Sequence, residues 1–183
     1  MKSLQIISNY NIEPLERILK KQQQNIKINK FIYSSIFSQL NTENDTDYIL
    51  IMATAEGLFS SVNKFKIKNT INYSLLNKEI NNFVNLISNK YKNNQVFLLS
   101  FCDITDTFFS NLSFYKNDNS ESYLFNYINN KISEKISKYS YIHIIDQDKI
   151  LLNFKKKFFD HEFFLASKSL YNLNFYTHFA KIF

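Results

Sequence analysis

Three polar residues near the two ends of the chain have the types that serine hydrolases use for catalysis. Ser8 closes a short apolar run, which is where several α/β hydrolases place their nucleophile. A serine hydroxyl can attack an ester there if a base lies within hydrogen-bond reach. Asp160 and His161 stand near the C-terminus, where some of these enzymes place the orienting acid and the base. Ser8, His161 and Asp160 are therefore the candidate catalytic residues, and the fold must bring them together, since adjacent side chains usually point apart.

The segment 8–15, which includes Ser8, also has a purely structural interpretation. Asn is one of the residue types that cap helices, and proline is favoured in the first helical turn. Asn11 and Pro14 have this arrangement. The segment 8–11 would then be a polar turn that leads from a strand into a capped helix, and the residues alone leave both interpretations open.

Three further reactive side chains have ordinary structural explanations. His143 alternates within an apolar run, so we predict a hydrogen-bonded core histidine, and we predict that His178 is a surface or interface residue of the last helix. Cys102 is the one cysteine and excludes an internal disulfide. It follows a strand, where a thiol can be reactive, although most lone cysteines are buried and inert.

The well-known mechanistic motifs are absent from the sequence. One glycine, Gly57, cannot supply GxGxxG, a P-loop or a GxSxG elbow. The sequence has no HExxH and no pair of cysteines for zinc. The run 103–106 does not match the motif of an aspartyl nucleophile for phosphoryl transfer. We therefore predict no metal and no cofactor.

Composition limits the class of protein. Hydrophobic residues make up 45%, which excludes a disordered chain. One Gly, one Pro, no Trp, 19 Phe and many Asn and Lys are what a strongly AT-rich bacterial genome would produce without selection on function. The net charge of +6 comes from scattered lysines, and the chain has only one arginine. Proteins that contact the bases and phosphates of nucleic acids favour arginine, because its guanidinium group can donate two parallel hydrogen bonds. The run 155–157 is better explained as a solvated turn, so nucleic acid is not the expected partner.

Hydropathy gives an expected location. The first residues lack the apolar core of a signal peptide, and no stretch approaches the roughly 20 apolar residues that span a bilayer. We therefore expect no membrane span and a cytoplasmic protein.

The elements that must position these residues alternate between strand and helix. Apolar runs predict strands, and apolar residues at helical spacing predict helices. The predicted strands are 4–7, 26–28, 48–52, 96–101 and 141–146; the predicted helices begin near 14 and cover 34–40, 74–91, 120–138 and 171–183, with a loose segment at 53–69. This alternation predicts an α/β three-layer sandwich around a central, mostly parallel sheet, with one domain over 1–183.

In such sheets, ligands bind beyond the carboxyl ends of the strands. Four segments therefore surround the expected site: 8–11, 53–57, 102–106 and the residues after Asp146. Within them we predict binding roles for Asn9, Asn11 and Asp103.

The first block, SNYNIEPLERIL, resembles the opening of the FkbH-like proteins, which begin with a strand, a Ser-Asn-aromatic turn and a Glu-Pro-Leu helix. The order of later features is similar. The run 47–52 resembles the family's strand after an acidic turn, and Asn129 precedes Asp146 as a helix Asn precedes a strand-end Asp in that family. Phe159-Asp160 before a final helix resembles its closing segment. The resemblance adds Asn129 to the predicted binding residues.

The resemblance implies an N-terminal SGNH-hydrolase-like domain with a flavodoxin-like sandwich. In that family a HAD-type phosphatase domain normally follows, associated with the transfer of a glyceryl unit to an acyl carrier protein, and relatives occur in polyketide and surface-polysaccharide pathways. We expect no HAD-type domain within 1–183, and both a stand-alone protein and a piece of a longer one remain open. Two departures from the SGNH-hydrolase sequence pattern argue against hydrolytic activity. Ser8-Asn9-Tyr10 replaces the Gly-Asp-Ser block, and Phe163 stands where the DxxH block needs histidine.

The expected function is therefore that of a non-catalytic or vestigial SGNH-like domain. It would be a binding or docking module of an acyl-carrier-protein-linked or surface-polysaccharide pathway, with an acyl carrier protein or a HAD-type phosphatase or transferase domain as partner. One alternative is an active serine esterase or acyltransferase using Ser8. A nucleic-acid-associated domain is a third.

Overall fold

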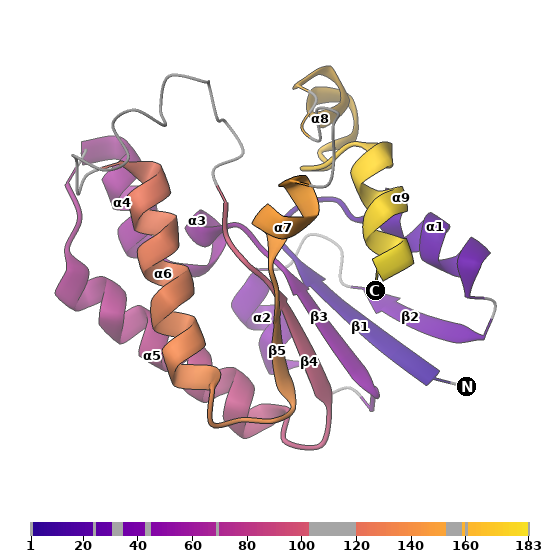
Figure 1. Ribbon diagram of the computed structural model, residues 1–183, viewed down its shortest axis with the longest axis horizontal. Helices are drawn as coiled ribbons and strands as arrows, with labels where there is room; N and C mark the ends of the chain where they lie inside the picture. Colours follow the sequence, from indigo (N-terminus) through magenta and orange to yellow (C-terminus); the bar gives the residue numbers. More distant parts are fainter. Residues whose placement is uncertain are drawn as a thin grey trace.

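Five parallel strands form one sheet in the order β2-β1-β3-β4-β5 (Figure 1). The computed structural model describes residues 2–23, 25–30, 35–42, 45–68, 70–102, 120–152, 159 and 161–182. The strands are β1 (Lys2–Ser8), β2 (Ile26–Lys30), β3 (Tyr48–Met52), β4 (Gln95–Leu99) and β5 (Ile142–Ile145). The predicted α/β class with a parallel sheet is confirmed, and this order is the flavodoxin-like one, in which the strand order reverses between β1 and β3.

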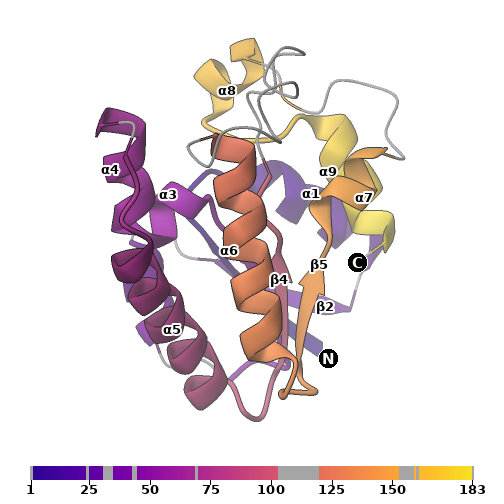
Figure 2. The same ribbon diagram turned by 60° about the vertical axis from the view of Figure 1, so that its left-hand side comes forward.

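Helices cover both faces of the sheet (Figures 1 and 2). The helices of the described residues are α1 (Glu13–Gln22), α2 (Ile36–Asn41), α3 (Ala55–Leu58), α4 (Ser60–Lys68), α5 (Tyr73–Lys90), α6 (Glu121–Ile136), α7 (Gln147–Leu152), α8 (His161–Ser167) and α9 (Leu173–Ile182). α1 and α9 lie on one face, and α5 and α6 lie on the other (Figure 1). α7 and α8 lie beyond the carboxyl ends of the strands in both views.

The strands divide their side chains between two cores because successive residues point to opposite faces. Ile49 and Ile51 of β3 pack with α5 and α6, and Leu50 and Met52 pack with α1 and α9. All four are fully buried. Burial on both faces is why the central strands are continuous apolar runs.

Of the two predicted helix caps, one is confirmed and one is corrected. Ser120 caps α6 by accepting a hydrogen bond from the backbone of Tyr123 at 3.2 Å. The predicted cap of α1 is one residue off: Ile12 is the N-cap, and Asn11 instead accepts from the backbone N–H of Glu13 at 3.0 Å. Pro14 lies in the first turn, as predicted.

Three other expectations are corrected. The segment 53–69, predicted as loose, contains α3 and α4, and Thr54 caps α3 through the N–H of Gly57. α7 and α8 were not predicted, because each is too short for a clear helical period. His143 is exposed on the edge strand β5, not in the core: its ring stacks on Phe97 and its Nε2 lies 2.9 Å from Gln95 Oε1.

Among the described residues, no helix is both long enough and apolar enough to cross a lipid bilayer.

Candidate binding cleft

A cleft of about 270 Å³ lies at the carboxyl ends of β3, β4 and β5. Its lining comes from the segments after these strands, from the start of α6, and from the chain around α8. The described lining residues are Ala53, Thr54, Ala55, Glu56, Ser100, Phe101, Cys102, Glu121, Phe125, Gln147, Phe159, Phe164, Leu170 and Tyr171. The cleft is where parallel α/β sheets bind ligands, and most of its wall is apolar.

Ser8 ends β1 at this edge of the sheet but is not among the residues that line the cleft. Its hydroxyl donates to the carbonyl of Tyr10 at 3.0 Å and accepts from the Tyr10 N–H at 3.2 Å. Its own backbone N–H and C=O are paired with the buried side-chain amide of Gln39, at 3.0 and 2.8 Å. Within the described residues, the Ser8 hydroxyl therefore closes a local turn and has no histidine partner.

Asn9 joins the first turn to the segment after β3. Its Nδ2 donates to Thr54 Oγ1 at 2.9 Å, and its Oδ1 accepts from the Thr54 N–H at 3.0 Å. A β-carbon at Gly57 would lie 2.7 Å from Asn9 Cγ and closer still to its Nδ2. The single glycine of the chain thus stands where the Asn9 amide needs room, and this pair fixes one rim of the cleft.

Asn129 holds the segment after β4. From α6 its Nδ2 donates to the Phe101 carbonyl at 2.7 Å, and its Oδ1 accepts from the Phe101 N–H at 2.9 Å. The amide thus continues the hydrogen-bond ladder past the end of the strand. Phe101 and Phe125, one turn before Asn129, both line the cleft, so the amide positions its wall.

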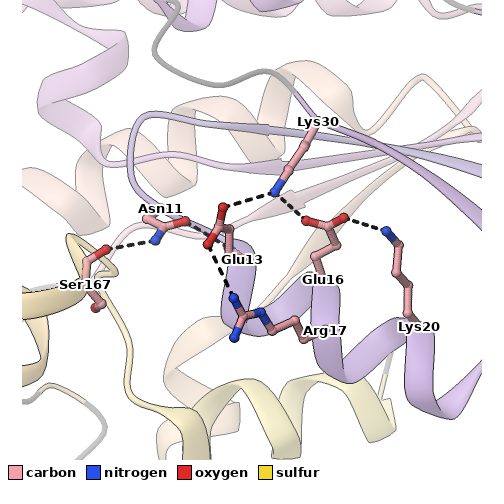
Figure 3. A network of polar contacts seen from close by, with 7 residues as sticks. All are labelled: Asn11, Glu13, Glu16, Arg17, Lys20, Lys30 and Ser167. Carbon is pink, nitrogen blue, oxygen red and sulfur yellow. Dashed lines mark hydrogen bonds and ion pairs between the residues drawn. The ribbon is translucent and has the colours of Figure 1, made fainter.

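Asn11 connects the start of α1 to the chain after α8, as Figure 3 shows. Its Nδ2 donates to the Ser167 carbonyl at 2.8 Å, and its backbone N–H donates to the Lys168 carbonyl at 3.0 Å. Leu170 and Tyr171, two and three residues after Lys168, line the cleft. The amides of Asn9, Asn11 and Asn129 therefore hold three separate loops around one site, and a direct role in ligand binding stays a prediction.

Polar side chains gather around the end of β4. Ser100 Oγ accepts from the Gln147 N–H at 2.8 Å, and Gln147 Nε2 contacts Cys102 Sγ. Tyr171 lies beside them, and burial raises its pKa well above the usual value, with nearby Cys102 adding to the rise. Burial raises the pKa of Tyr10 in the same way; its ring meets that of Tyr171 edge-on, with centroids 5.8 Å apart. Both phenols are therefore neutral at physiological pH.

The charges of the described lining are both negative. Glu56 belongs to the first turn of α3 and Glu121 to the first turn of α6, where helix dipoles favour carboxylates. No lysine or arginine is among the described residues of the wall, although the chain carries +6 overall. The two charged side chains in the described part of the wall are therefore acidic, in a chain whose net charge is positive.

The candidate catalytic set is not assembled by the described residues. Asp160 and Asp103 lie outside them. His161 begins α8, but its side chain is also outside the described part. The described residues contain no group of three or more His, Cys, Asp or Glu that could hold a metal ion. The roles of Ser8, His161 and Asp160 in catalysis thus remain predictions.

Sequence reasoning found some of the cleft and missed the rest. The carboxyl-edge rule pointed to the segments that contain Thr54, Cys102 and Gln147. It gave no reason to select Ser100 or Glu121. The resemblance marked Phe159, but nothing in the sequence selected Phe164 or Leu170 as part of the wall, because their place there depends on how the chain around α8 packs over the sheet edge.

No protein-family model and no curated protein sequence matches the chain. Among solved structures, the fold is similar to that of the N-terminal part of the protein BF1531 from Bacteroides fragilis, a crystal structure described as containing a phosphatase domain complexed with Mg. The TM-score is 0.76 at 17% sequence identity, over 99% of this chain. The chain spans 50% of the length of that structure. At this identity the likeness establishes the fold: the chain has the α/β fold of part of a phosphatase-domain protein.

Proposed function

We propose that this chain is an SGNH-like domain of the FkbH-like kind that binds an acyl group without hydrolysing it. It would serve as a binding and docking module in an acyl-carrier-protein-linked or surface-polysaccharide pathway. The observation that carries the proposal is the position of Ser8. Its hydroxyl donates to the Tyr10 carbonyl, and the residue stands outside the apolar cleft where a substrate would lie.

The geometry required of a nucleophile supports this choice. A catalytic serine needs a base within about 3 Å of its oxygen and a substrate carbonyl next to it. Ser8 is only 8% exposed, and a local turn uses its proton. A triad without its base loses several orders of magnitude in rate.

The expected partner is a HAD-type phosphatase or transferase domain, together with an acyl carrier protein. The first part is supported by the similar structure, which contains a phosphatase domain and is twice as long as the matched region. The second is supported by charge, since a chain of net charge +6 attracts an acidic carrier protein by long-range steering. Such steering weakens with salt, so carrier binding should fall as ionic strength rises.

Fluorophosphonate labelling with intact-protein mass spectrometry tests the proposal. We expect no covalent adduct on the folded chain under conditions in which a known serine esterase is fully labelled. Ser8→Ala and His161→Ala are the matched variants. An adduct on the wild type that disappears in Ser8→Ala would establish the esterase or acyltransferase alternative in place of the binding module.

The alternative has one observation in its favour. α8 begins at His161, and Phe164 of the same helix lines the cleft, so this histidine belongs to the element next to the site. Hydrolysis of p-nitrophenyl acetate that is lost in both Ser8→Ala and His161→Ala would identify His161 as the base. Equal background rates for the wild type and both variants are expected for a binding module.

A further inference from the structure

One wall of the cleft belongs to the hydrophobic core. Ala53, Ala55, Phe101 and Phe125 line the cleft, and all four are buried members of the core that packs against α5 and α6. A close-packed core resists displacement of its residues, because any shift opens voids or forces atoms to overlap. We therefore treat this inner wall as fixed in shape.

The wall formed by the chain around α8 is peripheral. Phe159 and Phe164 line the cleft, and their rings contact each other with centroids 6.1 Å apart. Both are half-buried and lie outside the two buried cores. None of the described side chains of α8 is fully buried, and Leu165 is 54% exposed. In both views α8 stands beyond the carboxyl ends of the strands (Figures 1 and 2).

The C-terminal end of α8 is tied to the turn before α1. Lys168 follows the helix with a φ of 56°, a left-handed conformation that residues other than glycine rarely adopt. The backbone N–H of Asn11 donates to the Lys168 carbonyl at 3.0 Å, and its Nδ2 donates to the Ser167 carbonyl at 2.8 Å. Ser169 Oγ donates to the Asn11 carbonyl at 2.7 Å. These contacts fix the direction in which α8 leaves the core.

The size of the cleft depends on where this peripheral wall lies. Its volume of about 270 Å³ is just below the range of about 300–1,000 Å³ typical of drug-sized pockets. A small cleft with one fixed apolar wall admits a hydrocarbon chain only up to the side chains that face that wall. Phe164 is the residue of α8 in the described lining, so its ring is the natural stop for such a chain.

We infer that Phe164 sets the length of the hydrocarbon chain that the cleft accepts, and that Asn11 is a positioning residue that holds α8 in place. This inference rests on the proposed acyl-binding function and adds its selectivity. Short chains fit between the core wall and Phe164, whereas longer chains meet its ring. Because α8 lies outside the core, the selectivity can change while the fold is preserved.

Straight-chain alcohols from 1-butanol to 1-decanol test the inference on the wild-type protein. Their head group is uncharged and identical, so the series varies only the length of the hydrocarbon. Nuclear magnetic resonance titrations of the ¹⁵N-labelled chain give the affinities, with shifts expected at Thr54, Phe101 and Cys102. Affinity should rise about fourfold for each methylene that becomes buried. It should stop rising at the length at which the chain reaches Phe164.

Two substitutions of Phe164 should move this limit in opposite directions. In Phe164→Ala the first alcohol beyond the wild-type limit should bind about fourfold more tightly than it binds the wild type, since one more methylene is buried. Phe164→Trp should move the limit to a shorter alcohol. A general loosening of α8 cannot produce both shifts. Leu165→Ala is the matched control, because it truncates an exposed residue of the same helix outside the described lining.

Asn11→Asp tests the positioning role without changing the lining. The aspartate still offers an acceptor to the Glu13 N–H, but it has no Nδ2 to donate to the Ser167 carbonyl. The limit should move toward longer alcohols, as in Phe164→Ala but by a smaller factor. An unchanged limit would show that Asn11 does not position α8.

The outcomes separate this inference from the non-catalytic function. Affinity that rises through the whole series in the wild type, a limit that neither substitution of Phe164 moves, or no binding of any alcohol would overturn the inference. None of these results decides whether a fluorophosphonate labels Ser8. Conversely, labelling at Ser8 would overturn the non-catalytic function, while a length limit set by Phe164 would still stand.

Discussion

The side-chain amide of Asn9 occupies the space that a β-carbon at Gly57 would fill. A β-carbon there would come within 2.7 Å of Asn9 Cγ and 3.0 Å of Ile36 Cδ1. Asn9 cannot simply turn away, because it makes two hydrogen bonds to Thr54. The single glycine of the chain is therefore required by packing, not by its backbone angles. It leaves room for Asn9, whose hydrogen bonds to Thr54 hold the first turn against the segment after β3.

This relationship predicts the sign of a double-mutant cycle. Gly57→Ala should destabilise the protein by about 1–3 kcal/mol, as small-to-large changes in packed sites do. In an Asn9→Ala background the clash with the amide is gone, and alanine is favoured over glycine in a helix by about 0.5–1 kcal/mol. The cost of Gly57→Ala should then shrink or reverse. Urea unfolding of the four proteins measures the coupling, and additive effects would contradict the role assigned to Asn9.

Replacing Asn129 should destabilise the protein much more than replacing its neighbour Asn130. Asn129→Ala removes both partners of the Phe101 backbone and should cost about 1–3 kcal/mol, since the freed groups are partly buried. Asn130 follows it on the same helix and is exposed, so Asn130→Ala should change stability by less than about 0.5 kcal/mol. Thermal unfolding of the two variants provides the comparison. Equal effects would show that the Phe101 contact is not what Asn129 contributes.

The ion pairs of Glu16 should make the stability of the protein depend on pH in the acid range. Burial raises the pKa of its carboxyl, but hydrogen bonds and charge from Lys20 and Lys30 outweigh burial and lower that pKa below its usual 4.5 (Figure 3). A lowered folded-state pKa means that the unfolded chain takes up the proton first. The contribution is therefore present above pH 4.5 and is lost as the pH falls through the folded value.

Glu16→Gln should accordingly cost about 1 kcal/mol at neutral pH, and the difference from wild type should vanish in acid. Urea unfolding over a range of acid pH measures this convergence. Glu134→Gln is the control, because its pair with Lys131 is solvent-exposed and should contribute little. A gap between wild type and Glu16→Gln that stays constant with pH would contradict the pairing with the two lysines.

Because of Tyr91, the stability of the protein should fall as the pH rises in the alkaline range. Burial raises its pKa from 10.0 to about 12, and its hydroxyl donates to the Leu40 carbonyl at 3.0 Å. The folded protein keeps this proton while the unfolded chain loses it, so stability falls as the pH rises from 10 toward the folded value. Tyr91→Phe should flatten this part of the profile at a cost of about 1 kcal/mol near neutrality. The more exposed Tyr123→Phe should preserve the slope, and phenolate absorbance reports the titration directly.

The class of fold could be predicted from the sequence because the signals are local. The apolar run 48–52 and the helical spacing in 74–91 each arise from residues that face a core, and the observed elements agree to within a residue or two. Ser120 could be recognised as a cap because the capping contact spans only three residues. His143 could not be placed, since an alternating strand looks the same at an edge as at the centre of a sheet.

The sequence by itself determined an α/β chain with polar residues at the carboxyl ends of its strands. Only the tertiary structure decided which of them face a common cleft. Ser8 lies at the correct edge but turns its hydroxyl to Tyr10, while Ser100, Glu121 and Tyr171 meet from distant parts of the chain. The reason is physical: strand and helix patterns depend on neighbours within a few residues, but a cleft depends on contacts whose partners lie many residues apart.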